Sequence, residues 1–425
     1  MNTPSLKTIT AILRDYTSLV VPLVLIAVAV IILLATPLLM GSKLQRRIDE
    51  NSIKLARRIE TLRSEAVPGE QWKVAQEYQK AHRADANQIS QLAQQTTQRE
   101  LLSYKIFPEP RDKSLGIYQE FGQRYRASID AMLKQLNATE CPTEQEVQDI
   151  LATSSPGART VGSGMPFPSD VGGFSRSKVD RMIADVVCTE RARSASMYAV
   201  ASDLAGYHYW GPKEGGREGK TFEYTGVEES VEACWHWQLG YWIIEDVATT
   251  ISALNAGSNS VLTSPVKRLV SVRFGGSGMS LKASDSVRPE YVILQQNQQP
   301  AALTLRTCNE GIDVVNFNLS VIVNNRDVLR FMRELCSGKT HRFRGYLGNE
   351  PEEIFKHNQI TILGSRTEAV DREGSEHTLY RYGDDAVVRL DLECEYVFSR
   401  SGYDEIKPAS VKEPLAGDGP DTMMQ

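Results

Sequence analysis

Residues 311–335 read GIDVVNFNLSVIVNNRDVLRFMREL, and this stretch decides the fold that the sequence predicts. Apolar and polar side chains alternate from Val315 to Val323, which is the period of a β-strand with one buried face. Asn324 or Asn325 then caps a helix with apolar side chains at helical spacing, and Gly338 ends it. A strand that runs directly into a helix predicts an α+β domain.

Two further strands complete this domain. Gln359–Leu363 is typical of a strand, and residues 387–398, VVRLDLECEYVF, show the most regular period-two alternation in the chain. Strand, helix, strand and strand make a small sandwich in which the helix covers one face of an antiparallel sheet. We assign residues 307–399 to this module.

A second, less regular copy of the same unit is predicted just before it, over residues 221–306. Thr225–Glu228 has the pattern of a capping box at the start of a helix, and Asn255–Gly257 supplies the stop signal at its end. After Pro265 a short strand is predicted around Val270–Phe274. The sequence therefore predicts two related α+β modules in tandem.

The start of the chain holds a long uncharged run. Leu19–Met40 reads LVVPLVLIAVAVIILLATPLLM, which as a helix is long enough for a hydrocarbon core of about 30 Å. Bulky residues replace the small ones of a cleavage site, so we predict a retained single transmembrane helix after a short cytoplasmic start, residues 1–18. Basic residues after the run favour a cytoplasmic location for the rest of the chain. Long domains, however, cross membranes largely regardless of such charges.

Residues 41–137 predict a helical stalk. Apolar side chains recur there at heptad-like spacing, and a dimeric coiled coil and a stalk packed on its own neighbours are equally compatible with this short seam. A linker and helical insert is expected at 138–220, and a disordered tail at 400–425. The predicted interaction residues of the seam are Leu44, Ile48, Leu55, Ile59 and Leu62.

Aromatic residues crowd the helix after residue 225. Trp235, Trp237 and Trp242 spread around that helix, so a part of the cluster is a candidate surface for a partner. Packing in the core is the favoured alternative.

The composition and the spacing of residues point to no catalytic, metal-binding or nucleic-acid-binding site. A net charge of −5 gives no basic field for nucleic acid, and the six cysteines and six histidines show no metal-ligand spacing. No catalytic residue, cofactor, metal site or small-molecule substrate is evident, so we expect a protein that is not an enzyme.

The layout of anchor, stalk and terminal unit resembles the PilO/GspM-like family of inner-membrane scaffold proteins of type IV pilus and type II secretion machines. The residues that carry the resemblance are Leu19–Met40, the stalk from Lys43, and Ile312–Phe398. The resemblance implies ferredoxin-like modules in the periplasm of a bacterium and a single membrane span. It also implies homo- or heterodimers that hold an assembly platform together. The insert departs from the family pattern.

We therefore expect a membrane-anchored scaffold that binds protein partners through its stalk and its α+β modules. A membrane-tethered sensor or enzyme ectodomain of unknown substrate is the alternative. A sensor of this kind would usually need an output domain, and an enzyme a clustered polar site.

Overall fold

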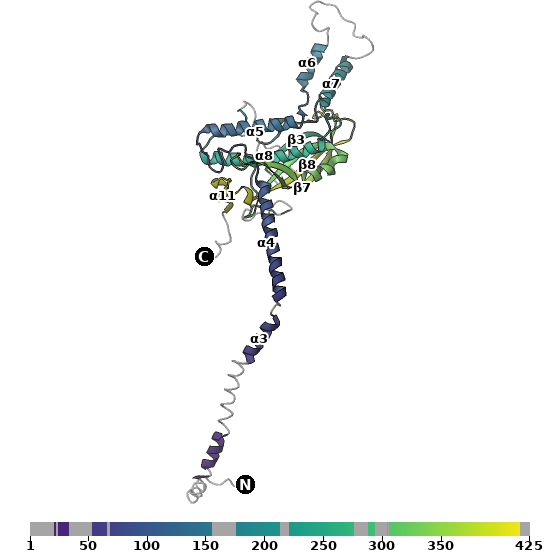
Figure 1. The fold of residues 1–425 in the computed structure, drawn as a ribbon. Helices are drawn as coiled ribbons and strands as arrows, with labels where there is room; N and C mark the ends of the chain where they lie inside the picture. Colours follow the sequence, from purple (N-terminus) through teal and green to yellow (C-terminus); the bar gives the residue numbers. More distant parts are fainter. Residues whose placement is uncertain are drawn as a thin grey trace, which may run out of the picture. The chain divides into compact units, whose positions relative to one another are not determined.

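The computed structural model describes residues 21–22, 24–33, 53–65, 69–154, 176–212, 221–275, 288–293, 304 and 306–416. The chain divides into two compact units, Met1–Ala86 and Asn87–Gln425. Each unit is described by itself, and Figure 1 shows the fold of the chain.

The first unit consists of helices in its described part. Helix α3 spans Lys54–Glu65, and helix α4 spans Gly69–Thr97, so its last turns belong to the second unit. Large apolar side chains on both helices are exposed to solvent.

The structure corrects the prediction of an N-terminal transmembrane helix. Among the described residues, no helix is long and apolar enough to cross a membrane. Of the run 19–40, the structure describes residues 21–22 and 24–33, which are helical. Residues 19–20, 23 and 34–40 lie outside the described part.

The second unit is built around a mixed six-stranded sheet with the strand order β1-β2-β3-β4-β8-β7. The three strands at one edge pair in parallel, and all other neighbours pair antiparallel. The strands are β1 Ala138–Thr139, β2 Met197–Tyr198, β3 Val266–Phe274, β4 Ile312–Asn324, β7 Ile360–Ala369 and β8 Val387–Ser399.

Strands β4 and β8 form the centre of the sheet. They pair without interruption from Ile312 opposite Ser399 to Asn324 opposite Val387. The alternating residues that predicted both strands lie in the main core, for example Leu319 opposite Leu392. The other face of β4 is also partly covered, because Ile322 belongs to a second, smaller core cluster.

The prediction of two separate modules in tandem is wrong. Strand β3 belongs to the expected first module, yet it pairs antiparallel with β4 of the expected second module, from Val266 opposite Val323 to Phe274 opposite Phe317. The insert adds the short edge strands β1 and β2 to the same sheet. One sheet results because the free edge of β4 gains backbone hydrogen bonds from β3 between Phe317 and Val323.

Helices cover the main core. Helix α5, Leu115–Gln135, and helix α8, Val227–Asn255, lie side by side, and their apolar side chains join one core cluster with those of the sheet (Figure 1). The remaining elements are α6 Glu144–Ser154, α7 Arg176–Arg193, the 3-10 turns η2 Ala201–Asp203 and η3 Asn325–Asp327, α9 Val328–Leu335, and a hairpin of β5 Lys339–Phe343 and β6 Glu353–His357.

The ends of α8 differ in how well the sequence predicted them. The helix begins after Gly226, and no side chain caps it, so the predicted capping box at Thr225–Glu228 does not form. The predicted stop at its end is confirmed, because Gly257 has a φ of 84°, a left-handed conformation that glycine adopts without strain.

The tail is folded up to residue 416, contrary to the disorder expected for 400–425. Helix α10 spans Arg400–Tyr403, and helix α11 spans Ala409–Ala416. Between them, the buried Lys407 Nζ lies 2.7 Å from Asp313 Oδ2 of β4. This ion pair and the buried side chains of Tyr403 and Val411 hold the tail to the sheet despite its polar composition. Residues 417–425 lie outside the described part.

Candidate functional site

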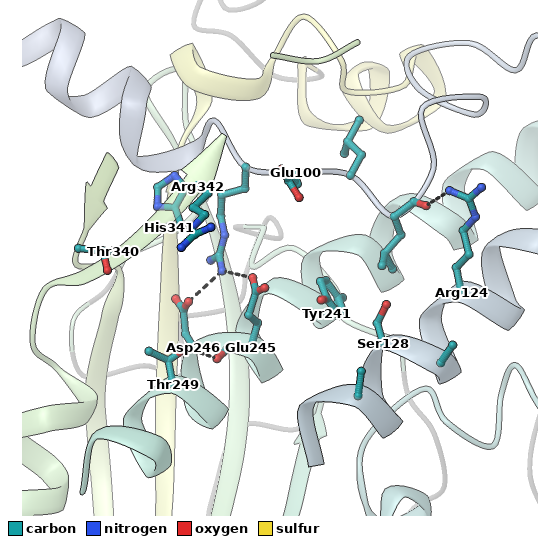
Figure 2. Close-up of a pocket in the computed structure, with 15 residues that line it drawn as sticks. Glu100, Arg124, Ser128, Tyr241, Glu245, Asp246, Thr249, Thr340, His341 and Arg342 are labelled. Atoms are coloured by element: carbon teal, nitrogen blue, oxygen red, sulfur yellow. Dashed lines mark hydrogen bonds and ion pairs between the residues drawn. The ribbon is translucent and has the colours of Figure 1, made fainter. Parts of the chain in front are cut away.

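A cavity of about 710 Å³ opens in the second unit between α5, α8 and the β5–β6 hairpin. Figure 2 shows Tyr241, Glu245 and Thr249 along its α8 wall, with Ser128 of α5 nearby. In the same view Arg124 lies at the opposite end of the cavity from His341. The fourth wall is the segment after α4, which begins with Gln98 and lines the cavity from Arg99 to Leu102.

Arg99 is the buried cation at the base of this cavity. Its side chain is 3 % exposed, and its guanidinium lies 2.9 Å from Asp246 Oδ1 and 2.5 Å from Glu245 Oε2. It also donates to the Tyr396 hydroxyl at 2.8 Å. Burial alone would lower the pKa of Arg99, but Asp246, Tyr396 and Glu245 outweigh burial and hold that pKa above its ordinary value.

Asp246 has two further hydrogen-bond partners besides Arg99. His357 Nε2 lies 2.8 Å from Asp246 Oδ2, and the Tyr396 hydroxyl donates to the same oxygen at 2.7 Å. Burial would raise the pKa of Asp246, but the charge of Arg99 and the hydrogen bonds from His357 and Tyr396 hold it well below the usual range. Asp246 is therefore an ionised carboxylate inside the protein.

A second histidine extends this chain of contacts. His341 Nδ1 lies 2.8 Å from His357 Nδ1, and His341 Nε2 lies 3.1 Å from the backbone oxygen of Gln98. Burial lowers the pKa of His341 to about 4, and the positive charge of Arg99 acts in the same direction.

The hairpin explains how the two rings meet. Lys339 stands opposite His357 in the β5–β6 register, and His341 stands opposite Phe355. His341 and His357 are thus diagonal neighbours on one face of the hairpin, since side chains two residues apart on a strand share a face. Asp246 reaches them from α8, in the middle of its apolar stripe.

The chemistry available at this site is recognition of polar groups and movement of protons. Hydroxyl groups of Ser128, Thr249 and Thr340 line the cavity. Burial raises the pKa of Glu245, against the opposing charge of Arg99, while its side chain stays 40 % exposed. In the described part of the chain, no group of three or more His, Cys, Asp or Glu side chains is placed to hold a metal ion.

The predicted seam residues fall partly outside the described part. Leu44 and Ile48 lie there, and Leu62 belongs to α3 without a described side chain. Leu55 and Ile59 are each 58 % exposed, on one face of α3 because they are four residues apart.

The tryptophans of α8 are buried. Trp235 and Trp237 are 0 % exposed and Trp242 is 1 % exposed, so their side chains line the core. Two of the three indole groups have hydrogen-bond partners: Trp235 Nε1 donates to the Tyr291 hydroxyl at 2.8 Å, and Trp242 Nε1 donates to the Glu100 carbonyl at 2.9 Å. The buried Trp237 Nε1 has no hydrogen-bond partner among the described residues.

Sequence reasoning missed the polar residues of this site, the buried Arg99, Asp246 and His357 and the half-buried His341. One signal was available, because Glu245 and Asp246 interrupt an otherwise apolar helical stripe. Arg99, His341 and His357 carry no such signal, since their neighbours along the chain are ordinary polar residues.

Comparison with protein-family models, with curated proteins and with solved structures found no match. The resemblance to the PilO/GspM-like family therefore stays a prediction, as do the absence of catalysis and the location in a bacterial inner membrane.

Proposed function

We propose that this chain is a structural protein that associates with a second copy of itself through helices α3 and α4. The observation that supports this most is a row of exposed apolar side chains on α4, where Tyr78 is 66 %, Ile89 66 % and Leu92 55 % exposed. Exposed apolar groups of this size that share one face of a helix are typical of protein–protein contacts.

The row follows one face of the helix. Val74, Tyr78, Ile89 and Leu92 fall within about 60° of one another at 100° per residue. Leu55 and Ile59 make a shorter row on α3. In a helix–helix contact, such rows are buried against a partner row.

The charges of α4 suit a copy of the same chain. Its 29 residues include three acidic and three basic ones, so two such helices do not repel each other through net charge. Mixed charges beside an apolar row also allow ion pairs across a helix pair in either orientation.

Size-exclusion chromatography with light scattering on the whole chain, over a range of concentrations, tests this proposal. We expect a concentration-dependent dimer that Tyr78→Glu and Leu55→Glu weaken, because each places a charge in the apolar row. Gln76→Glu is the matched control, since residue 76 is exposed on the opposite face of α4. A chain that stays monomeric throughout would contradict self-association.

Cross-linking in cells separates this proposal from a heterodimer. A cross-link that joins α4 to a different chain, and that Tyr78→Glu removes, would identify a heterologous partner. The narrower assignment to a pilus or secretion platform rests on the family resemblance alone.

A second candidate function is binding of a small polar molecule in the cavity beside Glu245. The observation that favours it is a carboxyl group that is open to a cavity of about 710 Å³ while burial raises its pKa. Native mass spectrometry of the protein from its own source would detect a retained ligand. Ala131→Trp, which fills the cavity, should then remove it.

A further inference from the structure

We infer that His341 and His357 share one extra proton, and that this proton fastens the end of helix α4 to the β5–β6 hairpin and to α8. We call the set of Gln98, Arg99, Asp246, His341 and His357 the histidine clasp. The clasp goes beyond the proposed function and does not depend on it, because its contacts lie within the second unit.

The hydrogen bonds fix the number of protons. The Gln98 carbonyl can only accept, so His341 Nε2 must carry a hydrogen across their 3.1 Å contact. Asp246 is ionised, so His357 Nε2 must carry a hydrogen across their 2.8 Å contact. Both rings are therefore protonated on Nε2.

The remaining contact requires a third proton. The two Nδ1 atoms face each other at 2.8 Å, which is the distance of a hydrogen bond. With both Nε2 atoms protonated, two neutral rings would direct lone pairs at each other across this distance. Three ring protons on two imidazoles make one imidazolium, so the pair carries one positive charge.

The surroundings balance this charge. The groups that face the pair are Asp246 and Glu245 of α8, Arg99, Lys339 of β5 and the neutral hydroxyl of Tyr396. Lys339 Nζ is directed at the Leu335 carbonyl, 2.8 Å away. The two carboxylates compensate Arg99 and the imidazolium, whereas the ammonium group of Lys339 is solvated by three backbone carbonyl oxygens at the end of α9.

The position of the extra proton follows from burial. Desolvation, Arg99 and His357 all lower the pKa of His341, which makes His341 the neutral ring and the donor to Gln98. His357, in contact with the Asp246 carboxylate, is the cationic ring.

A metal ion between the rings is the competing explanation. Histidine ligands of metals usually donate their other ring hydrogen to a carboxylate or a backbone carbonyl, as both rings do here. Two nitrogens on tetrahedral zinc, at bonds of about 2.0–2.1 Å, would lie roughly 3.3 Å apart. The observed 2.8 Å is shorter and favours the proton.

Release of the proton opens the clasp. Above the pH of release, the Nδ1 atoms repel, and the hairpin loses its hold on Gln98. One released proton makes the local opening constant rise about tenfold per pH unit. Between this range and the acid range in which His341 itself takes up a proton, the clasp stays closed, so the fastening of α4 weakens as the pH rises through the range of release.

Hydrogen exchange with mass spectrometry on the whole chain tests the clasp, in peptides that cover residues 97–102 and 339–357. From about pH 6 to about pH 9, and after correction for intrinsic exchange, we expect wild-type protection to fall with a slope of one proton. His357→Gln should show weaker protection that is independent of pH. The control His82→Gln, exposed on α4, should keep the wild-type slope.

If His357→Gln does not fold, nitrogen NMR of the histidine rings in the wild-type protein still tests the proposal. Around neutral pH we expect one imidazolium and one neutral Nε2–H ring. Two neutral rings, or wild-type protection that does not change with pH, would overturn the proposal. Stoichiometric zinc, nickel or copper that a chelator removes together with the local protection would also overturn it, in favour of a metal site.

Discussion

Arg99 is the residue on which the buried charges of the second unit depend. Its guanidinium lies 2.9 Å from the Asp246 carboxylate, and both side chains are 3 % exposed. A buried pair of this kind is costly to break, because the buried Asp246 carboxylate and the partly buried Glu245 then lose the cation that they share. The effect of removing an arginine on the free energy of unfolding therefore depends on how deeply that arginine is buried.

Arg99→Met should lower the free energy of unfolding by about 3–5 kcal/mol. Arg124→Met is the matched control, because Arg124 is 49 % exposed and pairs with Glu120 at the surface, where a pair contributes at most about 1 kcal/mol. Urea unfolding of both variants checks this. Equal losses in the two variants would mean that Asp246 finds another partner.

His341 makes the fold sensitive to acid. Its pKa is about 4 in the folded protein and about 6.5 in the unfolded chain, so the unfolded chain binds more protons between these values. The contribution of His341 to stability is therefore intact above about pH 6.5 and falls as the pH drops toward 4.

This contribution should decrease by about 2 kcal/mol between neutral pH and about pH 5. Urea unfolding of the wild type and of His341→Asn at both pH values measures it as the difference between the two proteins. An equal loss of stability on acidification in both would show that His341 does not supply the acid sensitivity.

At the scale of elements, the end of α4 packs directly on α10. Thr97 Oγ1 donates to the Ser399 carbonyl at 2.8 Å. A Cβ atom added to Gly402 would lie 2.2 Å from the Gln94 carbonyl oxygen, so only glycine allows this approach. The backbone of α10 thus serves as a seat for α4.

Gly402→Ala should destabilise this contact by about 1–3 kcal/mol, because backbone atoms must move apart. Gly364→Ala in β7 is the control, since its added Cβ would meet its nearest neighbour at an ordinary 3.7 Å. Thermal melting of both variants measures the difference. A Gly402→Ala protein that melts as the wild type does would show that α10 shifts freely.

The sequence predicted single elements better than their partners. Alternation correctly located β4 and β8, since each has a buried face of regular period. Alternation does not say which strand edges meet, so β3 was placed in a module of its own although it pairs with β4. The clasp was beyond prediction for the same reason, since Gln98, Asp246, His341 and His357 meet only when distant elements pack.

At the scale of the molecule, the second unit has one six-stranded sheet that shares its main core with the helices. Its main core combines side chains of α5, α8, β3, β4 and β8, which span most of the unit's sequence. A segment that carries only β4, β7 and β8 would leave one edge of β4 and the core face of the sheet exposed to water.

Residues 307–399 alone should therefore lack a cooperative thermal transition, whereas residues 87–425 should unfold in one. Circular dichroism during heating checks both fragments. A sharp transition in the shorter fragment would restore it as an independent module, and the absence of a transition in the longer one would mean that it needs residues before 87.

The central position of β8 has a consequence for the synthesis of the chain on the ribosome. Strand β4 is complete at Asn324, but its partner begins only at Val387. At about 5–20 residues per second, one edge of a 13-residue strand with an apolar face waits roughly 3–12 seconds for its neighbour. During that interval the nascent chain presents a template for mispairing, and a chaperone that binds extended apolar segments would find its target there.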